Sequence, residues 1–278
     1  MDYKIVADSS CDLNEVMRNN IEVELVPFNI SVESKKYRDD ADIDMGDLVK
    51  RMLASPDPIK TSCPSPGDFL ESYEEDKDVF VVTISKELSG TYNSAILARD
   101  MALEKEPDRF IHVFNSKGAS VTETLIVLKI DELIKKGLDN STIVEKVDNY
   151  IEELDTYFIS EDLSNLIKNG RISKTKGLIA TVLNLKPIMG ADGDGNIQLV
   201  ENVRGSKKAF RKLVGIIGES KKEFKELVLA ISHASARDKA EKLKESIQSL
   251  YEFKDIVIVE TRGLSTAYVN HEGVILSF

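Results

Sequence analysis

The feature that most constrains this chain is an apolar run at residues 79–84 that leads into a turn rich in hydroxyl groups. Valine, phenylalanine, isoleucine and one threonine make up the run, which is typical of a strand buried on both faces of a parallel sheet. Ser89, Gly90 and Thr91 follow, and a helix-like segment comes next. Open α/β sheets bind ligands at the carboxyl ends of their strands, and a helix begins with free N–H groups and a positive dipole end. We therefore expect an anion or carboxylate to bind at this turn.

Strand-like and helix-like segments alternate through the first part of the chain. Apolar runs at residues 3–7, 21–26 and 110–114 accompany the central run, with helix-like sequence between them. This alternation predicts a doubly wound, mainly parallel α/β domain over residues 1–155.

The pattern changes after Asp155. Two strand-like segments flank a turn at residues 190–196 that is rich in glycine and aspartate, which predicts a hairpin. Helices and further strands follow it. We therefore expect a second α/β domain, with a mixed sheet, over residues 156–278.

Two local structures are also expected near the start of the chain. Ser10 or Asp12 is a suitable N-cap for a short helix that begins near Leu13. Residues 35–44 carry many charged side chains and are expected to form a loop.

The charge balance narrows the classes of partner. The 278 residues include 48 acidic and 37 basic side chains, and the net charge of -11 repels DNA, RNA and anionic lipid headgroups. The longest apolar runs are strand-sized, which is too short for a transmembrane helix. The first residues do not resemble a secretion signal, and the two cysteines, Cys11 and Cys63, are too few for a disulfide framework. We expect a cytoplasmic protein without nucleic-acid or integral-membrane association.

Motifs for nucleotide, hydrolytic and zinc chemistry are missing from the sequence. The chain has neither a Gly-x-x-x-x-Gly-Lys-Ser/Thr phosphate loop nor a Gly-x-Ser-x-Gly elbow. Its three histidines, His112, His233 and His271, lack the spacing of metal ligands. We therefore expect neither a metal nor a cofactor.

One turn has part of the pattern of a calcium loop. Asp192, Asp194 and Asn196 lie at alternate positions, but Ile197 stands where such a loop needs glycine and Val203 where it needs glutamate. We interpret the segment as a solvated hairpin turn.

Hydroxyl-bearing side chains follow several strands of the predicted parallel sheet. Residues 9–12, 89–91 and 115–118 each come after an apolar run, and strand ends on one side of such a sheet converge on one crevice. Thr61 and Ser62 lie in a segment that prolines hold extended. Any one of these hydroxyls could be an ordinary cap or turn residue, but their shared placement favours a common site.

Cationic side chains allow two interpretations. Arg171 is either a surface arginine or a cation of the site. A basic run in this acidic chain is either a solvated helix face or a docking patch for an acidic partner. The run comprises Arg204, Lys207, Lys208, Arg211 and Lys212.

Six short motifs extend over the whole chain. They read Asp-Ser-Ser-Cys-Asp-Leu at 8–13, Lys-Thr-Ser-Cys-Pro-Ser-Pro-Gly at 60–67, Leu-Ser-Gly-Thr-Tyr at 88–92, Asp-Leu-Ser-Asn-Leu at 162–166 leading into Gly-Arg-Ile-Ser at 170–173, Leu-Lys-Pro-Ile at 185–188, and Val-Arg-Gly-Ser-Lys-Lys-Ala at 203–209. Each motif is weak alone, but six in this order are specific. With them the chain resembles the DegV family, whose members are the fatty-acid-binding subunits of bacterial fatty acid kinase.

The resemblance implies a binding role for several of these residues. A long-chain fatty acid would lie in the N-terminal domain, with its carboxylate held at Thr61 and Ser89 and with Arg171 nearby. The ligand-binding residues expected on this basis are Thr61, Ser62, Ser89, Gly90, Arg171 and Tyr268.

The resemblance also implies a division of labour between two proteins. A separate kinase subunit would bring ATP and phosphorylate the bound acid, so that this chain has no catalytic residue of its own. Arg204, Lys207 and Lys208 would lie on the surface that meets the kinase.

Three positions depart from the usual family residues. Cys63 stands where glutamine is usual, Asn115 stands where aspartate is usual, and Tyr268 takes the place of a histidine.

Two other functions remain open on the residues alone. One is a small hydrolase with Ser89 as nucleophile, although no histidine is placed by the sequence as its base. The other is a ligand-sensing interaction module.

For the fatty-acid carrier, Phe28, Ile30 and Leu88 are candidate contacts of the acyl tail.

Overall fold

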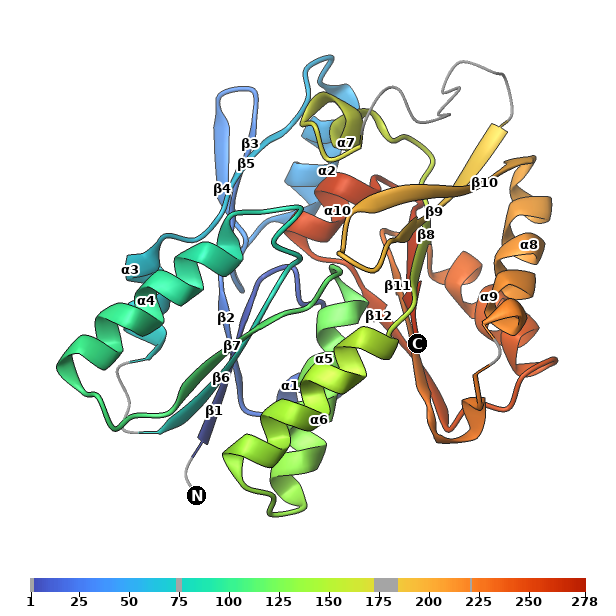
Figure 1. Ribbon diagram of the computed structural model, residues 1–278. Coiled ribbons are helices and arrows are strands. Elements are labelled where there is room, and N and C mark those ends of the chain that lie inside the picture. The colour runs from blue at the N-terminus through green and yellow to red at the C-terminus, as the bar shows by residue number, and fades with distance from the viewer. Residues whose placement is uncertain (1–2, 74–76, 173–184, 221) are drawn as a thin grey trace.

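The chain forms two large sheets with helices between and outside them (Figure 1). The computed structural model describes residues 3–73, 77–172, 185–220 and 222–278. Ser173, the last residue of the Gly-Arg-Ile-Ser motif, lies outside the described residues.

The first sheet has four strands, and all of its neighbouring pairs are parallel. In spatial order they are β2 (Val23–Val26), β1 (Tyr3–Asp8), β6 (Asp78–Thr83) and β7 (Ile111–Asn115). The central strand β6 is buried from Val79 to Thr83, as its continuous apolar run indicates. The predicted mainly parallel sheet is confirmed.

Helices cover both faces of this sheet. Figure 1 shows α3 and α4 on one face and α5 and α6 on the other. The helices of this part are α1 (Glu15–Asn20), α2 (Met45–Ala54), α3 (Pro66–Ser72), α4 (Thr91–Lys105), α5 (Val121–Lys135) and α6 (Asn140–Glu153).

The second sheet has six strands and is mixed, as predicted. Its pairs are antiparallel except for β11 with β12, which is parallel. In spatial order the strands are β10 (Ile197–Arg204), β9 (Leu185–Ala191), β8 (Thr156–Ile159), β13 (Val274–Ser277), β11 (Val228–His233) and β12 (Asp255–Glu260). The predicted hairpin is β9 and β10, and in its turn Asp192 accepts hydrogen bonds from the backbone N–H groups of Asp194 and Asn196.

The remaining helices lie outside or at the upper end of the second sheet. Figure 1 shows α8 and α9 on the face of this sheet that points away from the first one. These elements are α7 (Ser164–Lys168), α8 (Ser206–Glu219), the short 3-10 helix η1 (Phe224–Glu226), α9 (Arg237–Gln248) and α10 (Gly263–Val269).

Helix α5 lies between the two sheets and joins them. It packs on β1 and β6 of the first sheet and on β11 and β13 of the second. Its apolar side chains Leu125, Ile126 and Ile130 are fully buried, because a helix covered on opposite sides has little surface left for water. Along the chain, β7 is the last strand of the first sheet and β8 is the first strand of the second, and Asp155 lies between them. The domain boundary at Asp155 stays a prediction.

A small third sheet corrects one prediction. Residues 35–44 are not all loop, because β4 (Lys35–Arg38) pairs with β3 (Asn29–Val32), which also pairs with β5 (Lys60–Ser62). Only Tyr37 of β4 is buried, and its neighbours are charged and exposed. A single buried side chain is too little for the alternating pattern that marks a strand in sequence.

The first helix also differs from the prediction. Helix α1 begins at Glu15, and Asn14 caps it by accepting a hydrogen bond from Met17 N at 2.9 Å. Ser10 and Asp12 are not its caps, because their side chains take part in buried contacts with residues distant in sequence. Helix α10 was not predicted at all.

Candidate functional site

A cavity lies where the carboxyl ends of the parallel strands face the second sheet. It encloses about 860 Å³ of space, including its part open to solvent. Most of its lining is apolar. The apolar lining residues are Phe28, Ile84, Leu88, Ala119, Phe158, Leu166, Ala191, Ile197, Leu264, Val269 and Ile275.

Thr61 and Tyr268 meet at one part of the cavity wall. Thr61 lies on β5, opposite Ile30 of β3, and Tyr268 lies on α10. Their hydroxyl oxygens are 2.8 Å apart and share a hydrogen bond. Two segments more than 200 residues apart in sequence thus present a pair of hydroxyl groups to the cavity.

Ser89 lies in the turn between β6 and α4. The backbone N–H groups of Leu88 and Ser89 both donate to the carbonyl of Ser85, at 3.0 and 3.1 Å, and they close the turn. The Ser89 hydroxyl is 2.8 Å from that of Thr91, the first residue of α4. The N-cap residue Gly90 has no side chain to cap this fifteen-residue helix, so its N-terminus favours a nearby anion.

Arg171 supports the same turn from the other side. Its Nε donates to the carbonyl of Leu88 at 3.1 Å, and its Nη1 donates to the carbonyl of Asn169. The side chain is half-buried and lines the cavity. Arg171 therefore fixes the backbone next to Ser89 and brings a positive charge to the cavity.

The predicted ligand-binding residues separate into two groups. Four of them, Thr61, Ser89, Arg171 and Tyr268, line the cavity. Ser62 and Gly90 are exposed and do not line it, Ser62 because adjacent strand residues point to opposite faces.

The predicted tail contacts and partner residues are placed as follows. Phe28 and Leu88 line the cavity, whereas Ile30 packs in a neighbouring apolar cluster. The three basic residues at the end of β10 and the start of α8 are exposed, namely Arg204, Lys207 and Lys208.

Three serines line the cavity in addition to the predicted ligand-binding residues. They are Ser10, Ser120 and Ser265. The Ser120 hydroxyl donates a hydrogen bond to the Asp12 carboxylate at 2.5 Å. It also forms a hydrogen bond with the Ser232 hydroxyl at 2.7 Å. Ser10 lies in segment 9–12, which the sequence predicts at a common site with the turn at Ser89, whereas Ser120 and Ser265 lie on other segments that carry no such local signal.

Buried carboxyl groups lie close to this wall. Asp8 accepts hydrogen bonds from Ile84 N and Ser10 N, and Asp12 accepts one from Arg262 N at 2.8 Å. Burial raises the pKa of Asp8 and that of Asp12 to about 7 in each case, because a charged carboxylate is poorly solvated there. Burial also raises the pKa of Glu123 well above its usual range, with the charge of Asp8 adding to the effect.

The geometry offers little for hydrolysis. The Ser89 hydroxyl is bonded to Thr91 rather than to a base, and none of the three histidines lines the cavity. Within the described ranges, no group of three or more histidine, cysteine or acidic residues could hold a metal ion.

The described helices include none that is both long and apolar enough to cross a membrane. This result concerns only the part of the chain that the structure describes.

Comparison with known proteins gives consistent matches over the whole chain. The model of a family described as "Uncharacterised protein, DegV family" matches residues 2–275. A DegV domain-containing protein of Streptococcus pneumoniae is 33% identical over 280 residues, which cover 100% of this chain and 99% of that protein.

Two solved structures are similar in fold and sequence. A DegV family protein from Ruminococcus gnavus, refined with vaccenic acid, has a TM-score of 0.96 and 38% identity, with 99% of each chain covered. The Streptococcus pneumoniae Fatty Acid Kinase (Fak) B3 protein, loaded with linoleic acid, has a TM-score of 0.92 and 33% identity, with 100% of this chain and 99% of that one covered. With a family model, a sequence relative and two structures in agreement, the chain belongs to the DegV family.

Proposed function

We propose that this protein binds a long-chain fatty acid, with the tail in the cavity and the carboxylate at Thr61 and Ser89. The observation that carries the proposal is the apolar cavity whose wall ends in hydroxyl groups beside the N-terminus of α4. The fatty acids held by the Ruminococcus gnavus and Streptococcus pneumoniae relatives support it.

The tail supplies most of the affinity. Burying a methylene contributes about 0.8 kcal/mol, so a long acyl chain contributes on the order of 10 kcal/mol before ordering costs. A hydrogen bond to a charged group contributes only about 1.5–3 kcal/mol. The hydroxyls of Thr61 and Ser89 therefore set the register of the acid in the cavity.

The carboxylate is then presented to a separate ATP-dependent kinase subunit. Hydroxyl groups hold a carboxylate without the two-point grip of an arginine fork, and they leave an oxygen available to attack the terminal phosphorus of ATP. That attack forms an acyl phosphate and releases ADP. The similarity to the Fak B3 protein supports this partnership.

The contact with the kinase involves the exposed basic residues Arg204, Lys207 and Lys208. The protein itself is the non-catalytic subunit and works in the cytoplasm, where ATP is present. Its free cysteines, Cys11 and Cys63, are compatible with a reducing compartment.

Native mass spectrometry of the protein purified from cells tests the proposal. We expect a co-purified long-chain acid of defined mass, which lipid extraction identifies independently. An empty cavity together with esterase turnover would instead support the hydrolase with Ser89 as nucleophile.

A further inference from the structure

Helix α10 carries part of the cavity wall. Leu264 and Tyr268 both line the cavity, because residues four apart lie on one face of a helix. The helix has only seven residues, too few to be stable alone. Its position therefore depends on its packing against α2 and α7 and on the contacts at its two ends.

The carboxylate of Asp39 holds the N-terminal end of α10. It accepts hydrogen bonds from Gly263 N at 3.0 Å, Leu264 N at 2.8 Å and the Ser9 hydroxyl at 2.9 Å. A side chain at position 263 would collide with it, since an added Cβ would be 2.4 Å from Asp39 Oδ1. Asp39 is 2% exposed, so these donors replace the water that a carboxylate otherwise needs.

Asp39 and Thr61 are positioned by the same strand. Asp39 directly follows β4, and its N–H donates to the carbonyl of Phe28 at 2.9 Å, next to β3. Thr61 pairs with Ile30 of β3 from the other side. The small three-stranded sheet therefore sets the distance from the anchor of α10 to the hydroxyl that Tyr268 meets.

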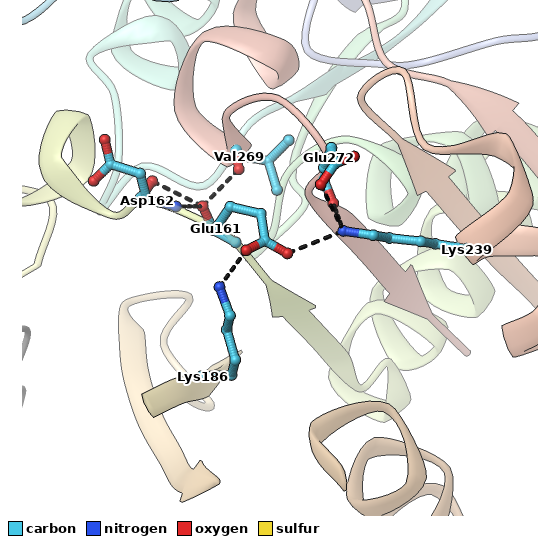
Figure 2. Close-up of polar contacts among 7 residues, drawn as sticks. Glu161, Asp162, Lys186, Lys239, Val269 and Glu272 are labelled. Atoms are coloured by element: carbon cyan, nitrogen blue, oxygen red, sulfur yellow. Dashed lines mark hydrogen bonds and ion pairs between the residues drawn. The ribbon is translucent and has the colours of Figure 1, made fainter. Parts of the chain in front are cut away.

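The C-terminal end of α10 is held by different residues. The Ser160 hydroxyl donates to the carbonyl of Val269 at 2.6 Å. Figure 2 shows Glu161 between Lys186 and Lys239, with Lys239 also bonded to Glu272 in the turn after α10. None of these contacts involves Asp39.

We propose that Asp39 is a positioning residue for the carboxylate site. By holding the first N–H groups of α10, it places the Tyr268 hydroxyl against Thr61 and so directs the Thr61 hydroxyl toward the bound acid. This inference rests on the proposed fatty-acid binding.

The Asp39→Asn variant tests the inference with two ligands that differ only in the head group. Either orientation of the amide places its NH₂ group against Gly263 N or Leu264 N, so α10 loses one anchor. We expect the dissociation constant for linoleic acid to rise by about tenfold, the loss of one hydrogen bond to a charged group. The dissociation constant for linoleyl alcohol, which lacks the carboxylate, should rise by less than about threefold.

Nuclear magnetic resonance of linoleic acid labelled at its carboxyl carbon provides a second measurement. We expect the carboxyl resonance of the bound acid to move in Asp39→Asn, whereas a label in the terminal methyl group does not move. Asp139→Asn is the matched control, because Asp139 is a carboxylate that accepts hydrogen bonds from the Thr142 N–H and hydroxyl at the start of helix α6 and does not line the cavity. It should leave the affinity for the acid and that for the alcohol unchanged.

Tyr268→Phe completes a double-mutant cycle. It removes only the hydroxyl that Asp39 is inferred to place, so it should produce the same selective loss, and the double variant should lose no more than either single variant. Fully additive losses, or equal losses of acid and alcohol in Asp39→Asn, overturn the inference. Failure of the wild-type protein to bind linoleic acid overturns the proposed function instead.

Should Asp39→Asn fail to fold, Ser9→Ala replaces it. That change removes one of the three donors to the Asp39 carboxylate and leaves the carboxylate in place. It also removes the acceptor of the Phe28 N–H, which lies 3.0 Å from the Ser9 hydroxyl, so the affinity for both ligands should fall to some extent. Ser9→Ala should weaken the binding of linoleic acid severalfold more than the binding of linoleyl alcohol. Equal weakening of the two would count against the inference.

Discussion

Thr61 and Ser89 are held in different ways, and this affects what each can do. Thr61 is bonded to Tyr268 on a distant helix, whereas Ser89 is bonded locally to Thr91 in a turn that Arg171 supports. In the proposed function, both hydroxyls orient the carboxylate, and the acyl tail supplies most of the affinity.

At this scale we predict that Ser89→Ala and Thr61→Ala reduce turnover with the kinase partner more than they reduce acid binding. The tail still fills the cavity in each variant, but a carboxylate out of register is a poor nucleophile. Isothermal titration measures binding, and acyl phosphate formation measures turnover. Ser246→Ala, an exposed serine on α9, is the control. Abolished binding with normal turnover per bound acid would show the division of labour to be wrong.

At the scale of elements, the β9–β10 hairpin shows how a turn closes a site. Its Gly195 has a φ of +91°, and its carbonyl accepts a hydrogen bond from the Ser85 hydroxyl at 2.9 Å. Gly190, Ala191 and Ile197 of the same hairpin line the cavity. The hairpin tip thus joins the second sheet to the loop after β6.

Gly195→Ala should destabilise the protein strongly. An added Cβ would be 2.4 Å from the Ser85 hydroxyl and 2.8 Å from the Lys117 Cα, and the positive φ alone costs about 1–3 kcal/mol for other residues. Denaturant unfolding measures the loss. Gly193→Ala in the same turn has no atom within 4 Å of its new Cβ and should change the free energy of unfolding by less than about 0.5 kcal/mol. Equal effects of the two substitutions would refute this account.

At the scale of the whole molecule, buried carboxyl groups lie at the junction of the two sheets. Asp12 follows β1 of the first sheet and accepts a hydrogen bond from Arg262, which follows β12 of the second. Ser120, at the start of α5, joins Asp12 to Ser232 of β11. The stability of the contact between the two sheets should therefore depend on whether the Asp12 carboxyl group is protonated.

The direction of this pH dependence follows from the pKa of Asp12 in the folded and unfolded states. The pKa of Asp12 is about 7 in the folded protein and 3.8 as a free side chain, so the folded state binds more protons between these values and loses stability as pH rises through them. Burial lowers the pKa values of His112 and His233 from 6.5, which has the opposite effect. Asp12→Asn isolates the carboxyl group, because its amide imitates the protonated acid.

We expect Asp12→Asn to gain stability relative to the wild type by on the order of 2 kcal/mol between pH 5 and pH 8. Its amide oxygen keeps the bond from Arg262 N, and its NH₂ group can donate to the Ser120 hydroxyl. Denaturant unfolding at both pH values measures the difference. A difference between variant and wild type that does not change with pH would contradict the linkage.

Much of the architecture can be predicted because it depends on patterns within short segments of the sequence. The apolar run of β6 predicts a buried parallel strand, the alternation of segments predicts the first sheet, and the glycine-rich turn at residues 190–196 predicts a hairpin. The hydroxyl turn at Ser89, followed by a helix, also predicts an anion site, and this site stays a prediction. The six motifs then identify the DegV family.

Only the tertiary structure decided which residues meet at the cavity. Helix α10 has buried residues on nearly every side and thus no amphipathic period, and β4 shows a single buried side chain, so neither has a local signal. Asp39, Thr61 and Tyr268 are brought together by strand pairing and by hydrogen bonds that span up to 225 residues. Periodicity reports the surroundings of one segment, whereas contacts of this kind depend on how distant segments pack. The family resemblance implied that Thr61, Ser89, Arg171 and Tyr268 share one site, but the hydrogen bond between Thr61 and Tyr268 and the contacts of Asp39 with α10 depend on the tertiary structure alone.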